Sequence, residues 1–125
     1  MNVARNFLLI GVLYLVVGII LGMYMGGSGD HTLTPVHAHI NLLGFTLMVL
    51  FSLIYKVFSA MASNTSARVH FWAYQGGTLA MVCALFLMLG DFVPEATIGP
   101  VMPFAETAIL IGVLAFGWNA YKNAR

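Results

Sequence analysis

The chain has 125 residues, of which 61% are hydrophobic and 7% are charged, and its formal net charge is +1. A soluble domain carries about 25% charged residues, so this composition excludes an ordinary soluble protein and indicates an integral membrane protein. The small net charge comes with no cluster of basic residues, and we expect no nucleic-acid partner.

Four apolar stretches are each long enough to cross a hydrocarbon core about 30 Å thick, which takes about 20 helical residues. They lie at roughly residues 6–26, 35–59, 69–90 and 102–121. The first is longer than a signal-peptide core of about 7–15 residues, so we expect it to remain as a span. The sequence therefore predicts one domain over residues 1–125, an all-α membrane protein with four transmembrane helices in up-down-up-down order.

The charged residues predict how these spans are oriented. Every cation falls at one side of a four-span arrangement, and the set is Arg5, Lys56, Arg68, Lys122 and Arg125. Basic residues are retained on the cytoplasmic side, so both termini are predicted to be inside. Asp30, Asp91 and Glu95 lie in the two opposite loops, which face the periplasm if the protein is in a bacterial inner (cytoplasmic) membrane.

Helix ends and helix contacts also leave local signals. Thr34 before Pro35 is a candidate N-cap for the second span, and Asn64 is one of several candidates for the third. Small residues recur at every fourth position, as helices in close contact require. On the first span these are Gly18, Gly22 and Gly26, and on the third they are Gly76, Ala80 and Ala84.

The second span opens with two histidines, His37 and His39, which are the main candidates for a functional site. Residues i and i+2 of an α-helix lie about 200° apart, so the two imidazoles point to nearly opposite sides and serve two different neighbours. Ionisable groups inside a membrane are by default functional candidates. Glu106 lies at a similar depth on the fourth span, and His31 lies in the loop just above.

Imidazole is the favoured axial ligand of haem and a good ligand of copper and zinc. A haem is a flat apolar plate whose propionates seek water, so histidines near the outer interface suit it well. The small residues Ala38 and Gly44 leave space beside these ligands. We therefore predict haem b as the cofactor, with His37 and His39 as its ligands and with His31 and Glu106 as further candidate metal ligands.

The motif His37-Ala38-His39, followed by Leu43-Gly44, resembles the tenth helix of the catalytic subunit of haem-copper oxidases and nitric-oxide reductases. In that family the first histidine holds the high-spin haem and the second holds the low-spin haem. The family's twelve spans form three arcs of four, and the second, sixth and tenth helices carry the metal ligands. The histidine helix of this chain is the second of four, which is the equivalent place in one arc.

This resemblance implies that three copies of the chain form a homotrimeric ring similar to one whole oxidase subunit. It also implies a bis-histidine haem held by His37 of one chain and His39 of its neighbour. The histidines of the family's copper site and the arginines that pair with haem propionates have no counterparts here. Whether the chain is an enzyme is left open, and a haem protein for electron transfer or sensing fits better than an oxidase.

Two alternatives remain at this point. Met23, Met25, Met88 and Met102 lie near the outer histidines, and thioethers with imidazoles form a recognised copper environment, so the protein is alternatively a copper or zinc protein without haem. It is otherwise an accessory subunit that packs against a larger respiratory complex. For His31 and His70 we expect an ordinary interfacial role, in which the ring bonds a carbonyl group or reaches headgroup water.

Overall fold

The computed structural model describes all 125 residues, and it is helical without strands. Its elements in chain order are α1 (Val3–Ser28), α2 (Thr34–His39), η1 (Ile40–Thr46), α3 (Leu47–Val57), η2 (Ser59–Met61), α4 (Thr65–Leu89), α5 (Glu95–Ile98) and α6 (Val101–Asn123). The elements α2, η1 and α3 continue one another, so the chain has four helices long and apolar enough to cross a membrane. Four long apolar helices are thus confirmed, each within a few residues of the bounds predicted for a span.

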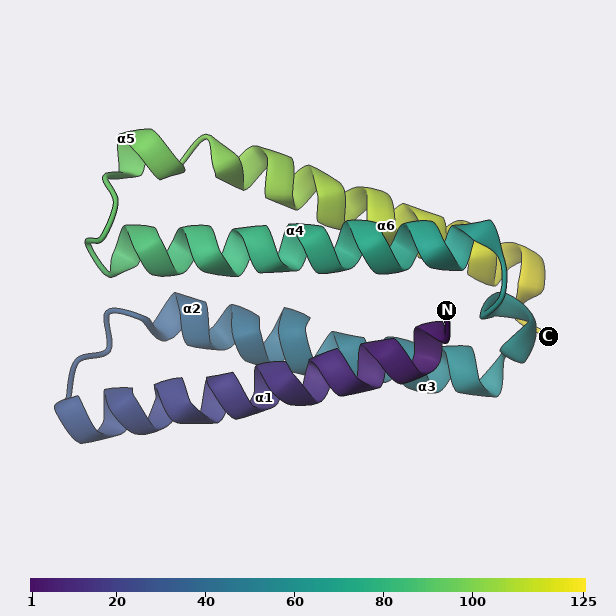
Figure 1. Cartoon of the computed structure of the whole chain (residues 1–125), viewed down its shortest axis with the longest axis horizontal. Coiled ribbons are helices and arrows are strands. Elements are labelled where there is room, and N and C mark those ends of the chain that lie inside the picture. The colour runs from purple at the N-terminus through teal and green to yellow at the C-terminus, as the bar shows by residue number, and fades with distance from the viewer.

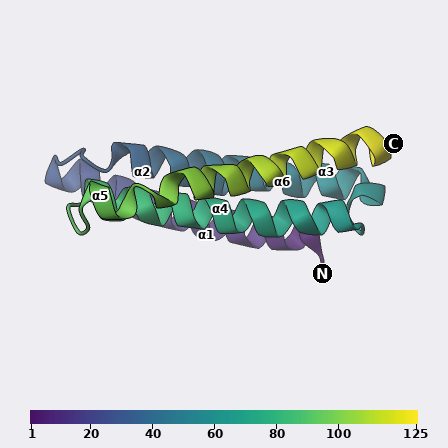
Figure 2. The same ribbon diagram turned by 90° about the horizontal axis from the view of Figure 1, so that it is seen from above.

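The four long helices form two antiparallel hairpins, one of α1 with α2–η1–α3 and the other of α4 with α6 (Figure 1). The loops from α1 to α2 and from α4 to α6 lie at one end, which we call the outer end. Both chain termini lie toward the opposite, inner end. Seen from above, α6 is tilted across the bundle and approaches α3 only toward the inner end (Figure 2).

The two hairpins are joined most tightly near the inner end. The ring of Phe7 lies at the centre of this core, within 5.5 Å of Phe51 and 5.0 Å of Phe71 between ring centroids. Phe116 of α6 contacts Phe51 at 5.0 Å. A smaller cluster of Val36, Ile40 and Val82 joins α2, η1 and α4 toward the outer end. The larger core of the bundle is therefore at the inner end, away from the histidine pair.

Hydrogen bonds at the helix ends confirm one predicted cap and contradict the other. The Asn64 side chain accepts a hydrogen bond from the Ala67 amide and caps α4, as predicted. The Thr34 prediction is wrong, because α2 begins at Thr34 itself and Leu33 stands at the N-cap without a side-chain bond. The Thr34 hydroxyl instead donates to the His31 carbonyl oxygen at 2.7 Å. Pro35 does stand in the first turn of α2, where its missing N–H leaves no helix bond unmade.

The predicted small-residue contacts are only partly correct, on α1 as well as on α4. Gly18 and Gly22 face α2 and η1 closely, whereas Gly26 has no neighbour within 4 Å. On α4 the close contact is made by Gly77, and Gly76 faces open space. A spacing of four residues identifies a stripe of small residues along a helix. The rotation of the helix about its axis decides which side of that stripe contacts a neighbouring helix.

Candidate functional site

The backbone of the second span changes directly after the histidine pair. Residues Ile40–Thr46 form a π-helix, in which the wider turn rotates every later side chain relative to an α-helix. The Thr46 hydroxyl donates to the Asn41 carbonyl oxygen, five residues earlier, at 3.0 Å. Gly44 lies under the ring of Tyr14, and a Cβ atom at this position would collide with that ring. Such π-helical segments are rare and occur frequently at functional sites.

His37 faces the seam between α1 and the second span. Its ring lies against Gly22, where an added Cβ atom would be 3.0 Å from the imidazole Cε1. The Asn41 amide nitrogen lies 3.2 Å from the His37 Nε2 atom and 3.4 Å from Nδ1, and the Asn41 side chain fits against Gly18. The glycines of α1 therefore make room for His37 and Asn41, and the imidazole is already engaged by a neighbour on its own helix.

His39 is held in a different way. Its Nδ1 atom lies 2.7 Å from the carbonyl oxygen of Pro35. A carbonyl oxygen only accepts hydrogen bonds, so Nδ1 is the donor, and in the neutral ring the lone pair is then on Nε2. A metal-binding imidazole is commonly oriented by such a bond from its second ring nitrogen. The half-buried His39 side chain thus has the tautomer and the free nitrogen that a metal ligand needs.

The side of the helix that presents His39 is turned away from α1. His37 faces α1, and Val36 and Ile40 face α4. Because His39 follows His37 by about 200° around the helix, its ring lies on the remaining flank of α2. Glu106 is exposed on α6, directly after the buried Ala105. Glu106 therefore lies on a surface that a single chain leaves uncovered, and His39 lies on one that it covers only in part.

The other predicted ligands do not form one metal-binding group with the pair. His31 is exposed in the loop after α1, and its carbonyl oxygen accepts bonds from the Thr34 amide and hydroxyl. No three histidine, cysteine, aspartate or glutamate side chains of one chain lie close enough to share a metal ion. No three of the side chains of His31, His37, His39 and Glu106 in one chain can therefore hold a single metal ion together.

His70 differs from its expected interfacial role. Its side chain is fully buried in the inner aromatic core, and its Nδ1 atom lies 2.9 Å from the hydroxyl of Tyr55. The ring of Phe51 meets it edge-on at 4.4 Å, and no partner in the chain satisfies its Nε2 atom. Nothing in the sequence around His70 indicated this burial, because the contacting rings come from four different helices.

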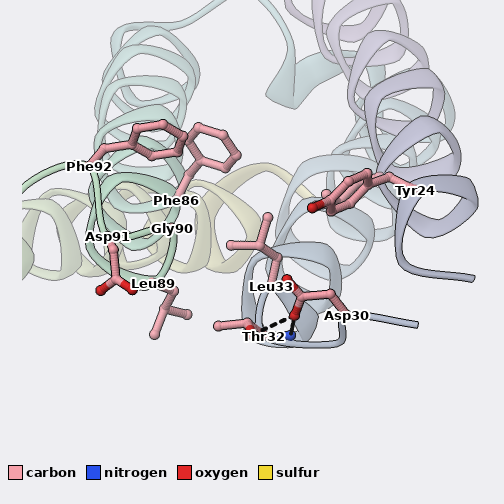
Figure 3. A pocket seen from close by; sticks show the side chains of 10 residues that line it. Tyr24, Asp30, Thr32, Leu33, Phe86, Leu89, Gly90, Asp91 and Phe92 are labelled. Carbon is pink, nitrogen blue, oxygen red and sulfur yellow. Dashed lines mark hydrogen bonds between the residues drawn. The ribbon is translucent and has the colours of Figure 1, made fainter. Parts of the chain in front are cut away.

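The outer end carries an acidic hollow of about 410 Å³ between the end of α1, the following loop and the end of α4 (Figure 3). Tyr24, Leu33 and Phe86 form apolar walls, and Asp30 and Asp91 lie on different sides of it. The Thr32 hydroxyl and amide both donate to Asp30, and these bonds lower the pKa of its carboxyl group below the usual value. This hollow gives the mouth of the bundle a negative character.

A scan of protein-family models finds no match to the chain, and no curated protein or solved structure matches it either.

Proposed function

We propose that the protein is a membrane haem protein in which His39 is the principal iron ligand, and that it serves electron transfer or sensing. The observation that carries the proposal is the bond from His39 Nδ1 to the Pro35 carbonyl oxygen, at 2.7 Å. This bond leaves Nε2 free, near the outer end of a span and on a flank that the chain covers only in part. Bound haem would supply one-electron chemistry at its iron.

The second axial ligand comes, in this proposal, from another copy of the chain. His37 is the candidate, since its ring is half-buried and the resemblance to haem-copper oxidases places such histidines on adjacent arcs. To bind iron through the nitrogen that Asn41 engages, the ring of His37 must exchange the Asn41 amide for the metal. A head-to-tail cyclic contact permits His37 of one copy to approach His39 of the next, and three copies would close the ring.

Two features of the surface support an interface between copies. Glu106 is exposed on a membrane span, and carboxylates in such positions generally face a protein interior or a water-filled cavity. The fourth span, α6, is also the least covered of the four. Within one chain, 11% of its most apolar 18-residue stretch is buried.

The basic residues at the inner end support a protein with both termini in the cytoplasm, within a bacterial inner membrane.

Spectroscopy of the purified protein with three histidine variants tests the proposal. Wild-type protein should show a Soret band and the low-spin spectrum of bis-histidine haem. His39→Ala should lose the haem while the oligomer, measured by native mass spectrometry, persists. His37→Ala should retain haem in a five-coordinate, high-spin state. His31→Ala is the matched control, because this loop residue is exposed and the proposal gives it no ligand role.

Three results would overturn the proposal in different ways. A full bis-histidine spectrum in His39→Ala would remove this residue from the site. Bound copper or zinc without a Soret band would replace haem by the metal-protein alternative. A protein that binds neither haem nor metal, and copurifies with a larger respiratory complex, would indicate the accessory subunit.

A further inference from the structure

A continuous apolar groove runs between α1 and α4, on the side of the bundle away from His39. Two adjoining hollows form it, of about 420 Å³ and about 580 Å³. They share Val17, Ile40, Val82 and Cys83, so they are parts of one space. The groove extends from Tyr24 near the outer end to Trp72 nearer the inner end. Its volume falls in the range of about 300–1,000 Å³ that is typical of small-molecule sites.

Two polar side chains with unused hydrogen-bonding groups line the larger hollow. The Tyr14 hydroxyl forms no hydrogen bond with another residue of the chain. The Gln75 amide donates to the sulfur of Met48 at 3.3 Å, which is a weak acceptor. The hydrocarbon core of a bilayer holds no water that could bond such groups, so leaving either of them unpaired is unfavourable. The Tyr14 hydroxyl and the second N–H of the Gln75 amide are therefore unpaired donors on residues that line an otherwise apolar space.

The depth of these donors restricts the ligand. Tyr14 lies near the middle of α1 and Gln75 near the middle of α4, so each is at least about 15 Å from the nearer end of its helix at 1.5 Å per residue. The ester and phosphate oxygens of phospholipids lie at the membrane interface, too far away to reach them. An acceptor at this depth must belong to a molecule that dissolves in the bilayer core itself.

The groove is open toward the lipid. Gly76 has no neighbour within 4 Å, and Trp72 is 67% exposed beside it. Cys83 is also exposed on the same side of α4. A ligand can therefore enter sideways from the bilayer without passing through either aqueous end of the bundle.

We propose that this groove binds a lipid-soluble quinone. The two oxygens of the ring accept hydrogen bonds from the Tyr14 hydroxyl and the Gln75 amide, and the apolar tail follows the groove past Val17 and Ile20 toward Tyr24. Ile40 forms part of the wall and directly follows His39 in the chain. The groove thus lies across the same helix from the proposed haem ligand, but quinone binding itself requires no haem.

The fluorescence of Trp72 provides a direct test, because the chain has two tryptophans and Trp118→Phe leaves only this one. Decyl-benzoquinone, a short-tailed quinone that quenches tryptophan at close range, should quench Trp72 saturably in haem-free protein in lipid nanodiscs. Tyr14→Phe and Gln75→Leu should each weaken binding about three- to tenfold, as the loss of one hydrogen bond predicts. Tyr121→Phe is the matched control, since Tyr121 is 84% exposed near the inner end.

Competition separates a quinone site from a site for any apolar chain. Decylbenzene has the same tail without the oxygens, and we expect it to displace the quinone only at far higher concentration. Equal competition by decylbenzene, unsaturable quenching, or unchanged affinity in Tyr14→Phe and Gln75→Leu variants of normal helix content would each overturn the proposal. His39→Ala should retain quinone binding, so failure of the haem proposal and failure of this one give different results.

Discussion

The contact between α4 and α6 gives the sharpest test of the packing. A Cβ atom added at Gly77 would lie 2.7 Å from the carbonyl oxygen of Ala105 and 2.8 Å from the backbone nitrogen of Ile109. These are backbone atoms, so the collision can be relieved only by moving one helix away from the other. The neighbouring Gly76 has nothing within 4 Å, and a Cβ atom there meets no obstacle.

Gly77→Ala and Gly76→Ala form a matched pair that isolates this collision. Both variants gain about 1 kcal/mol of helix propensity, and this gain cancels in the comparison. Overpacking of a well-packed contact costs about 1–3 kcal/mol, so Gly77→Ala should be less stable than Gly76→Ala by that amount. Unfolding in mixed micelles by titration with dodecyl sulfate, followed by circular dichroism, measures the difference. Equal free energies of unfolding would refute the close approach of α4 and α6 at Gly77.

Three further predictions concern polar groups. Asn119→Leu should lower the free energy of unfolding by about 2–3 kcal/mol in the same titration, because it leaves buried partners unbonded; unchanged stability would contradict this network. Tyr55→Phe should cost about 1–3 kcal/mol by leaving His70 Nδ1 unpaired, and adding His70→Phe should recover most of it, as a double-mutant cycle would show. Thr32→Val should raise the depressed pKa of Asp30 toward about 3.9, followed by NMR titration of the carboxyl carbon. Because folding lowers this pKa, its contribution to stability is present above pH 4 and is lost as the pH falls through the folded value.

The caps and contacts show where local patterns were sufficient and where they were not. Asn64 caps α4 as its side-chain chemistry predicts, because a cap depends on residues within one turn. Thr34 has the same chemistry but bonds back to His31, since the short loop brings that carbonyl oxygen within reach. Gly77 was missed because its role depends on the approach of α6, more than 25 residues later in the chain.

The candidate site was also predictable from the sequence only in part. Its location at the mouth of the second span follows from the sequence, which places His37 and His39 directly after a polar loop. The sequence does not show that the His37 ring is engaged while the His39 ring keeps a free nitrogen. This difference depends on Gly22 of α1, which faces His37, and on the fold of the first turn around Pro35. The Tyr14 and Gln75 donors were also unremarkable in sequence, and they share a hollow only because the two hairpins part between α1 and α4.

The sequence by itself determined that four helices are long and apolar enough to cross a membrane, because this depends on the length and composition of each segment alone. It also determined how far along its helix each ionisable group lies, since this distance follows from the residue number and the rise of a helix. Only the tertiary structure decided which imidazole keeps a free nitrogen, where His70 is buried, and which glycines carry contacts. These depend on helix rotation and on partners distant in the chain, and the π-helix at Ile40–Thr46 alters that rotation within the very helix that holds the histidines.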